Sequence, residues 1–249
     1  MTDLPAITLP AEHVIPAWRN AYLATSDDDE RPALYRTVLV EWYDDGLRFV
    51  STDGYVIITS YADGDRWTDG PVHAPDHDQA PAGAIVAIAA DKLMADFLKH
   101  RTAEVKAWAR ADQEGLDADP IDVTFSLGTI DEPNTGQQRL DIGERRALIV
   151  SADNERIALP LYEGEFPNWR AVMAGYRPRP KTQVRATAGV LHRLGQLRTR
   201  GALDCELELT MAAQTGGAEL VLVTGTGRVP LEAAFVPRQE EAAERDEAA

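Results

Sequence analysis

The feature that most constrains this chain is an order of expected elements that occurs three times. Each round begins with a short apolar strand, continues with a helix that has one apolar face, and ends in several strands separated by turn residues. The rounds begin near Ile7, Gly83 and Thr182. The residues themselves do not repeat, so the signal lies in the order of elements. This order predicts an α+β protein with antiparallel sheets.

The first two rounds contain the clearest elements. A helix is expected to open after Pro10 and run to about residue 25, although Pro16 favours a later start. The dipeptide Asp53-Gly54 separates two β-branched apolar runs and predicts a hairpin with a type I′ turn. A second helix is expected from Asp91, its N-cap, to about residue 112. The later strands are expected at 120–130, 138–142, 145–153, 156–164, 182–187, 203–213, 218–225 and 228–237, with a short helix at 188–201.

The composition and the cysteine count are typical of a globular protein of the cytoplasm. The chain has 249 residues, of which 44% are hydrophobic and 27% are charged, and it has a single cysteine, Cys205. One cysteine excludes an internal disulfide, no apolar run reaches the length of a membrane span, and the first residues lack the pattern of a signal peptide. We therefore expect a cytoplasmic protein.

Charge is distributed unevenly along the chain. The formal net charge is −16, which as a whole opposes binding to nucleic acid. Between Phe166 and Arg200, however, the chain has eight Lys or Arg residues and no Asp or Glu. That segment carries +8 and the rest of the chain carries −24. The basic run favours contact with a phosphate backbone, although it could also balance acidic protein across an interface.

Patterns that would indicate catalysis are weak. His73, Asp76, His77 and Asp78 are metal-ligand types at close spacing, but they lie in a Pro-rich loop without a third anchored ligand. The stretch GTGRVP lacks a following helix that would bind phosphate. No Ser, Cys or Lys lies in a nucleophile motif. We therefore expect neither an enzyme nor a metal or other cofactor.

Two motifs resemble a known family. The stretch LRFVSTDGYVIITS, residues 47–60, resembles the L-x-x-V-A-T-D-G-x-R-L-A signature in the middle domain of the bacterial DNA polymerase III beta subunit, a DNA sliding clamp. LYEGEFPNWRAV, residues 161–172, resembles the L-x-D-G-x-F-P-x-Y-x-x-V segment that ends that domain. Both occur in the family's order and spacing, and AAFVPRQ near the end of the chain is a weaker match to V-x-M-P-M-R. Val56 departs from the family, which has Arg there.

The resemblance implies a DNA clamp fold, in which repeated units place sheets outside and helices inside a ring. We expect a clamp domain at residues 1–172, a shorter clamp-like half-domain at 173–238 and a disordered acidic tail at 239–249. Family rings contain about twelve units. A chain of three units would close such a ring with four copies, or with three copies if residues 166–181 hide a fourth unit.

The resemblance also implies a pocket for short peptide motifs of polymerases and clamp loaders. The matching positions and the residues that would complete its rim are Ile57, Pro167, Val172, Val236 and Pro237. Their apolar side chains are also typical of an ordinary core, and Asp53-Gly54 could be nothing more than a turn.

Duplex DNA is the other partner that the resemblance implies. The candidate contacts are cations of the expected helices and of the basic run, namely Arg19, Lys92, Lys99, Arg101, Lys106, Arg177, Arg179, Lys181, Arg193, Arg198 and Arg200. The helix after Asp91 is weaker support, because acidic residues leave it a net charge of only about +1.

The predicted function is therefore that of a sliding clamp, a non-enzymatic ring that encircles DNA and tethers a replicative polymerase as a processivity factor. The small size suggests a bacteriophage version, acting in the cytoplasm of a bacterial host. The alternative is a clamp-like binding or decoy module that interacts with replication proteins without forming a ring.

Overall fold

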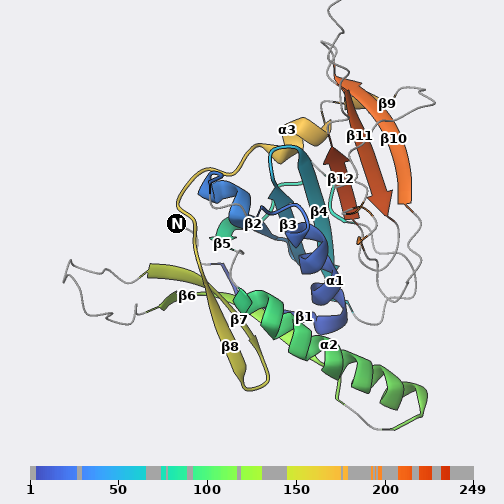
Figure 1. Ribbon diagram of the computed structural model, residues 1–249. Coiled ribbons are helices and arrows are strands. Elements are labelled where there is room, and N and C mark those ends of the chain that lie inside the picture. Colours follow the sequence, from blue (N-terminus) through green and yellow to red (C-terminus); the bar gives the residue numbers. More distant parts are fainter. Residues whose placement is uncertain are drawn as a thin grey trace, which may run out of the picture.

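The structure is a computed structural model of the whole chain, and it confirms the predicted α+β class with antiparallel sheets (Figure 1). The residues that it describes are 4–26, 30–65, 74–76, 78–88, 92–116, 119–130, 145–174, 176–178, 192, 194, 196–197, 207–214, 219–225 and 231–235. The expected strands at 138–142 and 182–187 and the expected tail at 239–249 lie outside these residues.

The first unit has the predicted order of strand, helix and strands. Its elements are β1 (Ile7–Pro10), α1 (Ala11–Tyr22), the 3₁₀ turn η1 (Ala33–Arg36), β2 (Thr37–Trp42), β3 (Gly46–Thr52) and β4 (Val56–Asp63). Pro16 does not delay the helix, so the expectation of a later start is wrong. Pro10 takes the N-cap position with φ −58°, and Ala11 N donates to Ile121 O at 2.9 Å, which fixes the first turn. Burial of one helix face offsets the hydrogen bond that Pro16 cannot donate.

The second unit repeats this order. Its elements are β5 (Gly83–Ile88), α2 (Lys92–Gln113), β6 (Asp122–Ile130), β7 (Arg145–Ala152) and β8 (Glu155–Pro160). After it come α3 (Trp169–Ala174) and β9 (Tyr176–Pro178), which the sequence did not predict, and then β10 (Leu207–Gln214), β11 (Glu219–Gly225) and β12 (Leu231–Phe235). The described part of 166–181 holds only α3 and β9, not a fourth unit.

Each of the first two units gives its first strand to the other unit. β1 pairs antiparallel with β6, in the register Ile7↔Phe125 to Pro10↔Asp122. β5 pairs antiparallel with β2, in the register Thr37↔Ile88 to Trp42↔Gly83. The two sheets of the structure therefore have the strand orders β1-β6-β7-β8 and β5-β2-β3-β4-β12-β11-β10-β9.

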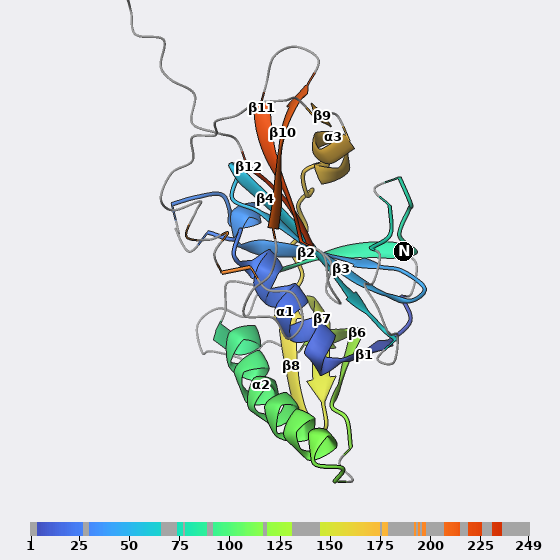
Figure 2. The same cartoon turned by 90° about the vertical axis from the view of Figure 1, so that its right-hand side faces the viewer.

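Helices α1 and α2 pack beside each other against the sheets (Figure 2). One core joins them with both units, and its largest members include Trp18, Trp42, Phe49, Phe97 and Phe125. The strands β2 and β3 have two apolar faces: alternate residues such as Val40 and Phe49 point to the helices, and Leu39 and Val50 point to α3. The third unit continues the larger sheet through β12 and β4. That residues 173–238 form a separate half-domain remains a prediction.

The turn between β3 and β4 differs from the expected type I′ turn. Thr52 pairs with Ile57, and Asp53 N donates to Val56 O at 3.3 Å, so Gly54 and Tyr55 are the two central residues. Gly54 has φ +89°, and among the described residues other than glycine only Asp153 has a positive φ. A positive φ at the first central residue alone is the pattern of a type II′ turn.

Asp53 acts from outside the centre of this turn. Its Oδ1 accepts hydrogen bonds from the backbone N–H groups of Tyr55 and Val56, both at 2.9 Å, and its backbone O accepts one from Arg31 at 2.8 Å. The acidic residue is thus an acceptor for the turn, and glycine provides the positive φ.

We predict that Gly54→Ala destabilises the protein by about 1–3 kcal/mol, measured by chemical denaturation, because a side chain at φ +89° is strained and its Cβ would meet the Tyr35 hydroxyl at 3.0 Å. Gly115→Ala is the matched control. Gly115 also has a positive φ, of +68°, but its added Cβ would meet no atom within 4 Å. Equal destabilisation of the two variants would show that the Tyr35 contact contributes nothing.

Candidate functional site

The two motifs that are far apart in the sequence meet on the α3 face of the larger sheet. There Leu39, Val50 and Ala234 from the strands pack with Trp169 and Met173 of α3. Ile57 of the first motif, Phe166 and Val172 of the second, and Val86 of β5 pack against this cluster and are only partly buried. We call these nine residues the α3 cluster. Partly buried apolar side chains at one place on the surface are what an apolar ligand would contact.

The turn at Gly54 lies next to this cluster in the chain. It brings Ile57 into the register Ile57↔Ala234, so β12 flanks the same position. Tyr55, at the tip of the turn, is 64% exposed, and the Arg31 guanidinium lies 5.5 Å from its ring centroid. The turn therefore presents an exposed aromatic ring two residues before Ile57 of the α3 cluster.

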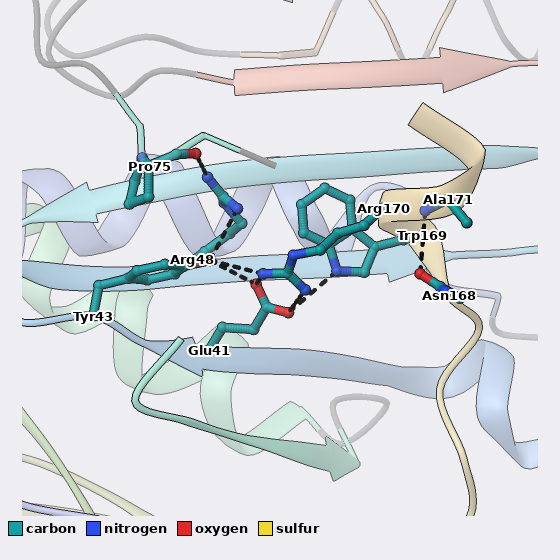
Figure 3. Close-up of polar contacts among 8 residues, drawn as sticks. All are labelled: Glu41, Tyr43, Arg48, Pro75, Asn168, Trp169, Arg170 and Ala171. Atoms are coloured by element: carbon teal, nitrogen blue, oxygen red, sulfur yellow. Dashed lines mark hydrogen bonds and ion pairs between the residues drawn. The ribbon is translucent and has the colours of Figure 1, made fainter. Parts of the chain in front are cut away.

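A buried carboxylate holds α3 on the sheet (Figure 3). Glu41 of β2 is 1% exposed, and it accepts two hydrogen bonds from Arg170, at 2.5 and 2.7 Å. Trp169 Nε1 donates to the same carboxylate at 3.2 Å, and the Tyr43 hydroxyl donates to it at 3.3 Å. A bidentate guanidinium–carboxylate pair fixes orientation as well as distance. Glu41 therefore sets where the helix of the second motif begins.

Arg48 completes this polar group from β3. It is 2% exposed, its Nη1 donates to the Tyr43 hydroxyl at 3.0 Å, and its Nη2 donates to the backbone O of Pro75. Its guanidinium lies 5.2 Å from the ring centroids of Tyr43 and Trp169, and that of Arg170 lies 4.5 Å from Trp169. The two cations therefore lie against aromatic faces, which favours their burial. We call Glu41, Tyr43, Arg48, Trp169 and Arg170 the Glu41 network.

Protonation in the Glu41 network follows from burial and pairing. Burial raises the pKa of Tyr43 against the opposing charge of Arg48. The phenol is therefore neutral at neutral pH and can donate to Glu41. Burial alone would lower the pKa of Arg170, but its hydrogen bonds to Glu41 and the charge of Glu41 outweigh this, and the pKa is raised. The network is thus one anion, two cations and a neutral phenol.

Local backbone features position α3. Asn168 Oδ1 accepts a hydrogen bond from Ala171 N at 3.1 Å, which is the N-cap arrangement, and Pro167 precedes it with a fixed φ. The short helix then turns Val172 and Met173 towards the sheet. Pro167 itself is exposed.

The predicted pocket residues have different outcomes. Ile57 and Val172 both pack against the α3 cluster, and Pro167 lies on the exposed segment just before α3. Val236 and Pro237 lie outside the described residues, directly after Phe235, which pairs with Val56. Their assignment as a peptide pocket stays a prediction.

The predicted DNA contacts on the helices are only partly available. Arg19, Lys99 and Lys106 are exposed. Arg19 donates to Thr102 Oγ1 at 3.2 Å, and although the residue as a whole is exposed, partial burial of its guanidinium beside α2 lowers its pKa. It borders a groove of about 320 Å³ between α1 and α2, which Lys99 also lines.

The structure contradicts the prediction that Arg101 contacts DNA. Its side chain is buried, and it pairs with Glu104 at 2.7 Å and with Asp153 and Glu155 at 2.9 Å each. A guanidinium that bonds three carboxylates joins α2 to the β7–β8 hairpin and does not present its charge to DNA. Sequence spacing could not show this, because two of the three carboxylates lie more than 50 residues away along the chain.

The remaining predicted DNA contacts come from α2 and from the basic run. The side chains of Lys92 in α2 and Arg177 in the run, and the whole of Arg179, Lys181, Arg193, Arg198 and Arg200, lie outside what the structure describes. Four neighbours in the run are described: Leu194 and Leu197 are buried against β4, β11 and β12, and His192 and Gln196 are exposed. Leu194 and Leu197 therefore pack on the sheet, and His192 and Gln196 do not.

Other kinds of site find no support in the part of the chain that the structure describes. No group of three or more His, Cys, Asp or Glu residues there could hold a metal ion. No helix there is long and apolar enough to cross a membrane. His73 and His77 of the weak metal motif lie outside the described residues.

The arrangement of the chain is similar to that of bacterial sliding clamps. Caulobacter crescentus pol III beta matches 94% of this chain and 65% of its own, at 14% identity and a TM-score of 0.45. The DNA polymerase sliding clamp of Bacillus subtilis covers 94% of this chain and 64% of its own, with 10% sequence identity and a TM-score of 0.43. The DNA polymerase III subunit beta of Pseudomonas aeruginosa covers 96% of this chain and 66% of its own, with 12% sequence identity and a TM-score of 0.43.

The chain therefore spans slightly less than two thirds of the length of these clamps. No protein-family model and no curated protein matches the sequence. At these identities the similarity concerns the arrangement of helices and strands.

Sequence reasoning missed the Glu41 network. A signal did exist, because Glu41 interrupts the apolar run VLVEWY in the middle of an expected strand. A charged residue in a strand that is buried on both faces needs a partner. What the sequence could not supply was the identity of that partner, Arg170, which is 129 residues away.

We predict that Glu41→Gln costs about 2–4 kcal/mol of stability, measured by denaturant unfolding, because it leaves the partly buried Arg170 guanidinium without its counter-charge. In the Arg170→Met background the same change should cost less, since the two residues act as a pair. Glu163→Gln, an exposed carboxylate just before α3, is the control and should be close to neutral. Additive effects of the Glu41 and Arg170 changes would contradict the pairing.

Proposed function

We propose that this protein is a DNA sliding clamp, a non-enzymatic processivity factor that surrounds duplex DNA and tethers a polymerase. The observation that carries the proposal is the meeting of the two clamp-like motifs in the α3 cluster. This meeting takes place within a fold of two units that exchange their first strands. A turn motif and a helix motif that were matched separately in the sequence thus form one surface.

The proposal assigns two surfaces to two tasks. The helices α1 and α2, with the buried side chains of Leu194 and Leu197, lie on one side of the larger sheet. The α3 cluster lies on its other side. A clamp needs this separation, because loose phosphate contact on the helix side must leave the partner-binding side free. An acidic outer surface would repel DNA from the wrong side.

The proposed ring contains four copies of the chain. Three units per chain and about twelve units per ring give this number, and the described part of 166–181 holds no further unit. Polymerase and clamp loader are the proposed partners, in the cytoplasm of a bacterium, and the size favours a bacteriophage origin.

The DNA contact can be tested with Arg193, Arg198 and Arg200 changed together to Glu. We predict weaker binding to duplex DNA. In a plot of the logarithm of the binding constant against the logarithm of the salt concentration, the slope should become shallower by about 0.9 for each phosphate that the variant no longer neutralises. Changing the same residues to Gln removes charge without reversing it and should flatten the slope in the same direction. A slope that stays at the wild-type value would assign the basic run to a protein surface, and a chain that binds clamp peptides but no DNA would be a clamp-like module without a ring.

The peptide contact can be tested with Ile57→Ser combined with Val172→Ser. We predict at least about a tenfold decrease in affinity for a peptide with Leu and Phe anchors, measured by fluorescence titration, because apolar anchors dominate small interfaces. Leu116→Ser is the control, since Leu116 is a 58% exposed apolar residue beyond the end of α2. If the wild type binds no such peptide and the double variant unfolds, Ile57 and Val172 are core residues only.

A further inference from the structure

The α3 cluster has two different ends. Val86 of β5 pairs with Leu39 of β2, and Leu39 pairs with Val50 of β3. Ile57 of β4 and its partner Ala234 of β12 continue this row on the other side of β3. Leu39, Val50 and Ala234 are buried, whereas Val86 and Ile57 are only partly buried. The cluster therefore offers apolar surface at a Val86 end and at an Ile57 end.

The segment that leads from β8 to α3 borders the Val86 end, since it passes β5 on its way (Figure 1). Leu161 forms a bridge with Ala87, and Tyr162 N donates to Val86 O at 2.8 Å. Four residues later, Phe166 packs against the α3 cluster. Residues 162–166 are therefore attached to the cluster at both of their ends.

Two carboxylates lie in this attached segment. Glu163 directly follows the residue that bonds to Val86, and Glu165 directly precedes Phe166. Both glutamates are exposed, and neither side chain forms a hydrogen bond or an ion pair with another residue that the structure describes. Two negative charges are therefore held beside the apolar surface of the Val86 end.

The described cations of this face do not balance these charges. Arg170 gives its charge to Glu41 through two hydrogen bonds, and Arg48 is 2% exposed (Figure 3). Arg31 belongs to the Ile57 end, where its guanidinium lies against the ring of Tyr55. The Val86 end is thus acidic, and the Ile57 end is not.

We propose that the α3 cluster binds a peptide that carries a Lys or Arg about four or five positions from the apolar anchor that contacts Ile57. From β4 to β5 the sheet spans three strand spacings, about 14 Å, and an extended peptide advances about 3.3 Å per residue. A cation at that distance would meet Glu163 and Glu165, and complementary charge favours one partner over another. The pocket itself rests on the proposed function; the charge of its partner is the new inference.

The same charges act against an acidic occupant. Residues 239–249 of this chain contain five carboxylates and one arginine, and they follow β12, whose Ala234 is the partner of Ile57. The two glutamates would repel such a segment from the Val86 end. Selection by charge therefore favours a basic partner over the chain's own acidic residues.

Peptides that differ only in charge test the proposal. Three peptides share a Leu-Phe anchor and carry Lys, Gln or Glu at the fourth and fifth positions on both sides of it. We expect fluorescence titration at low salt to give about three- to tenfold higher affinity for the Lys peptide than for the Glu peptide, and the difference should shrink as salt is added. The full chain with Glu163→Lys and Glu165→Lys should invert this order. A Lys peptide with Ser in place of both anchors should not bind.

Asp112→Lys combined with Glu114→Lys is the matched control. These carboxylates are also exposed and two residues apart, but they lie at the end of α2, and their replacement changes the net charge by the same amount. This variant should keep the wild-type order of affinities, and both variants should unfold at the wild-type temperature. Equal affinity of the wild type for all three peptides would overturn the charge selection and leave the pocket intact, as would the same loss of preference in both variants. A wild type that binds none of the three would overturn the pocket of the proposed function, and the selection with it.

Discussion

Exchange of the first strands is the constraint on which the rest of the structure depends. Because β1 completes the sheet of the second unit and β5 that of the first, neither unit has all its backbone partners without the other. The side chains follow the same rule. Trp18 lies 5.4 Å from Phe49, and Phe49 lies 5.8 Å from Phe125, so a row of aromatic rings runs from one unit into the other. The first two units therefore form one cooperative body.

The Glu41 network shows how a polar group can set the position of a surface feature. An apolar residue at position 41 would bury as well, but it would not select one orientation for the segment that follows Pro167. The paired carboxylate does so, because Arg170 and Trp169 must both reach it. α3 is held by this pairing and by the α3 cluster together. Ile57 and Val172 therefore pack against the same cluster partly because of an interaction that neither of them makes.

Local patterns allowed much of the fold to be predicted from the sequence. The periodicity of α1 and α2, the hairpin at Asp53-Gly54 and the repeat of strand, helix and strands are encoded by neighbouring residues, and the structure contains them. α3 and β9 were not predicted because six and three residues are too few to show a period. The exchanged strands, the partners of Glu41 and the burial of Arg101 depend on contacts between distant parts of the chain. The type II′ turn was missed because Asp53 suggested that the acidic residue was central, whereas it acts as an acceptor beside the turn.

The distribution of charge limits how a clamp of this kind could contact DNA. Arg101 is neutralised inside the protein, and Arg19 is hydrogen-bonded to the neighbouring helix, so the helices offer fewer cations than their sequence suggests. Of the eight cations between Phe166 and Arg200, Arg170 is taken by Glu41. The attraction for phosphate in the proposed ring therefore depends mainly on seven cations that follow α3 in the chain. With the remainder of the chain strongly acidic, such a ring would hold DNA through one basic segment per copy, which suits contact that is loose enough for sliding.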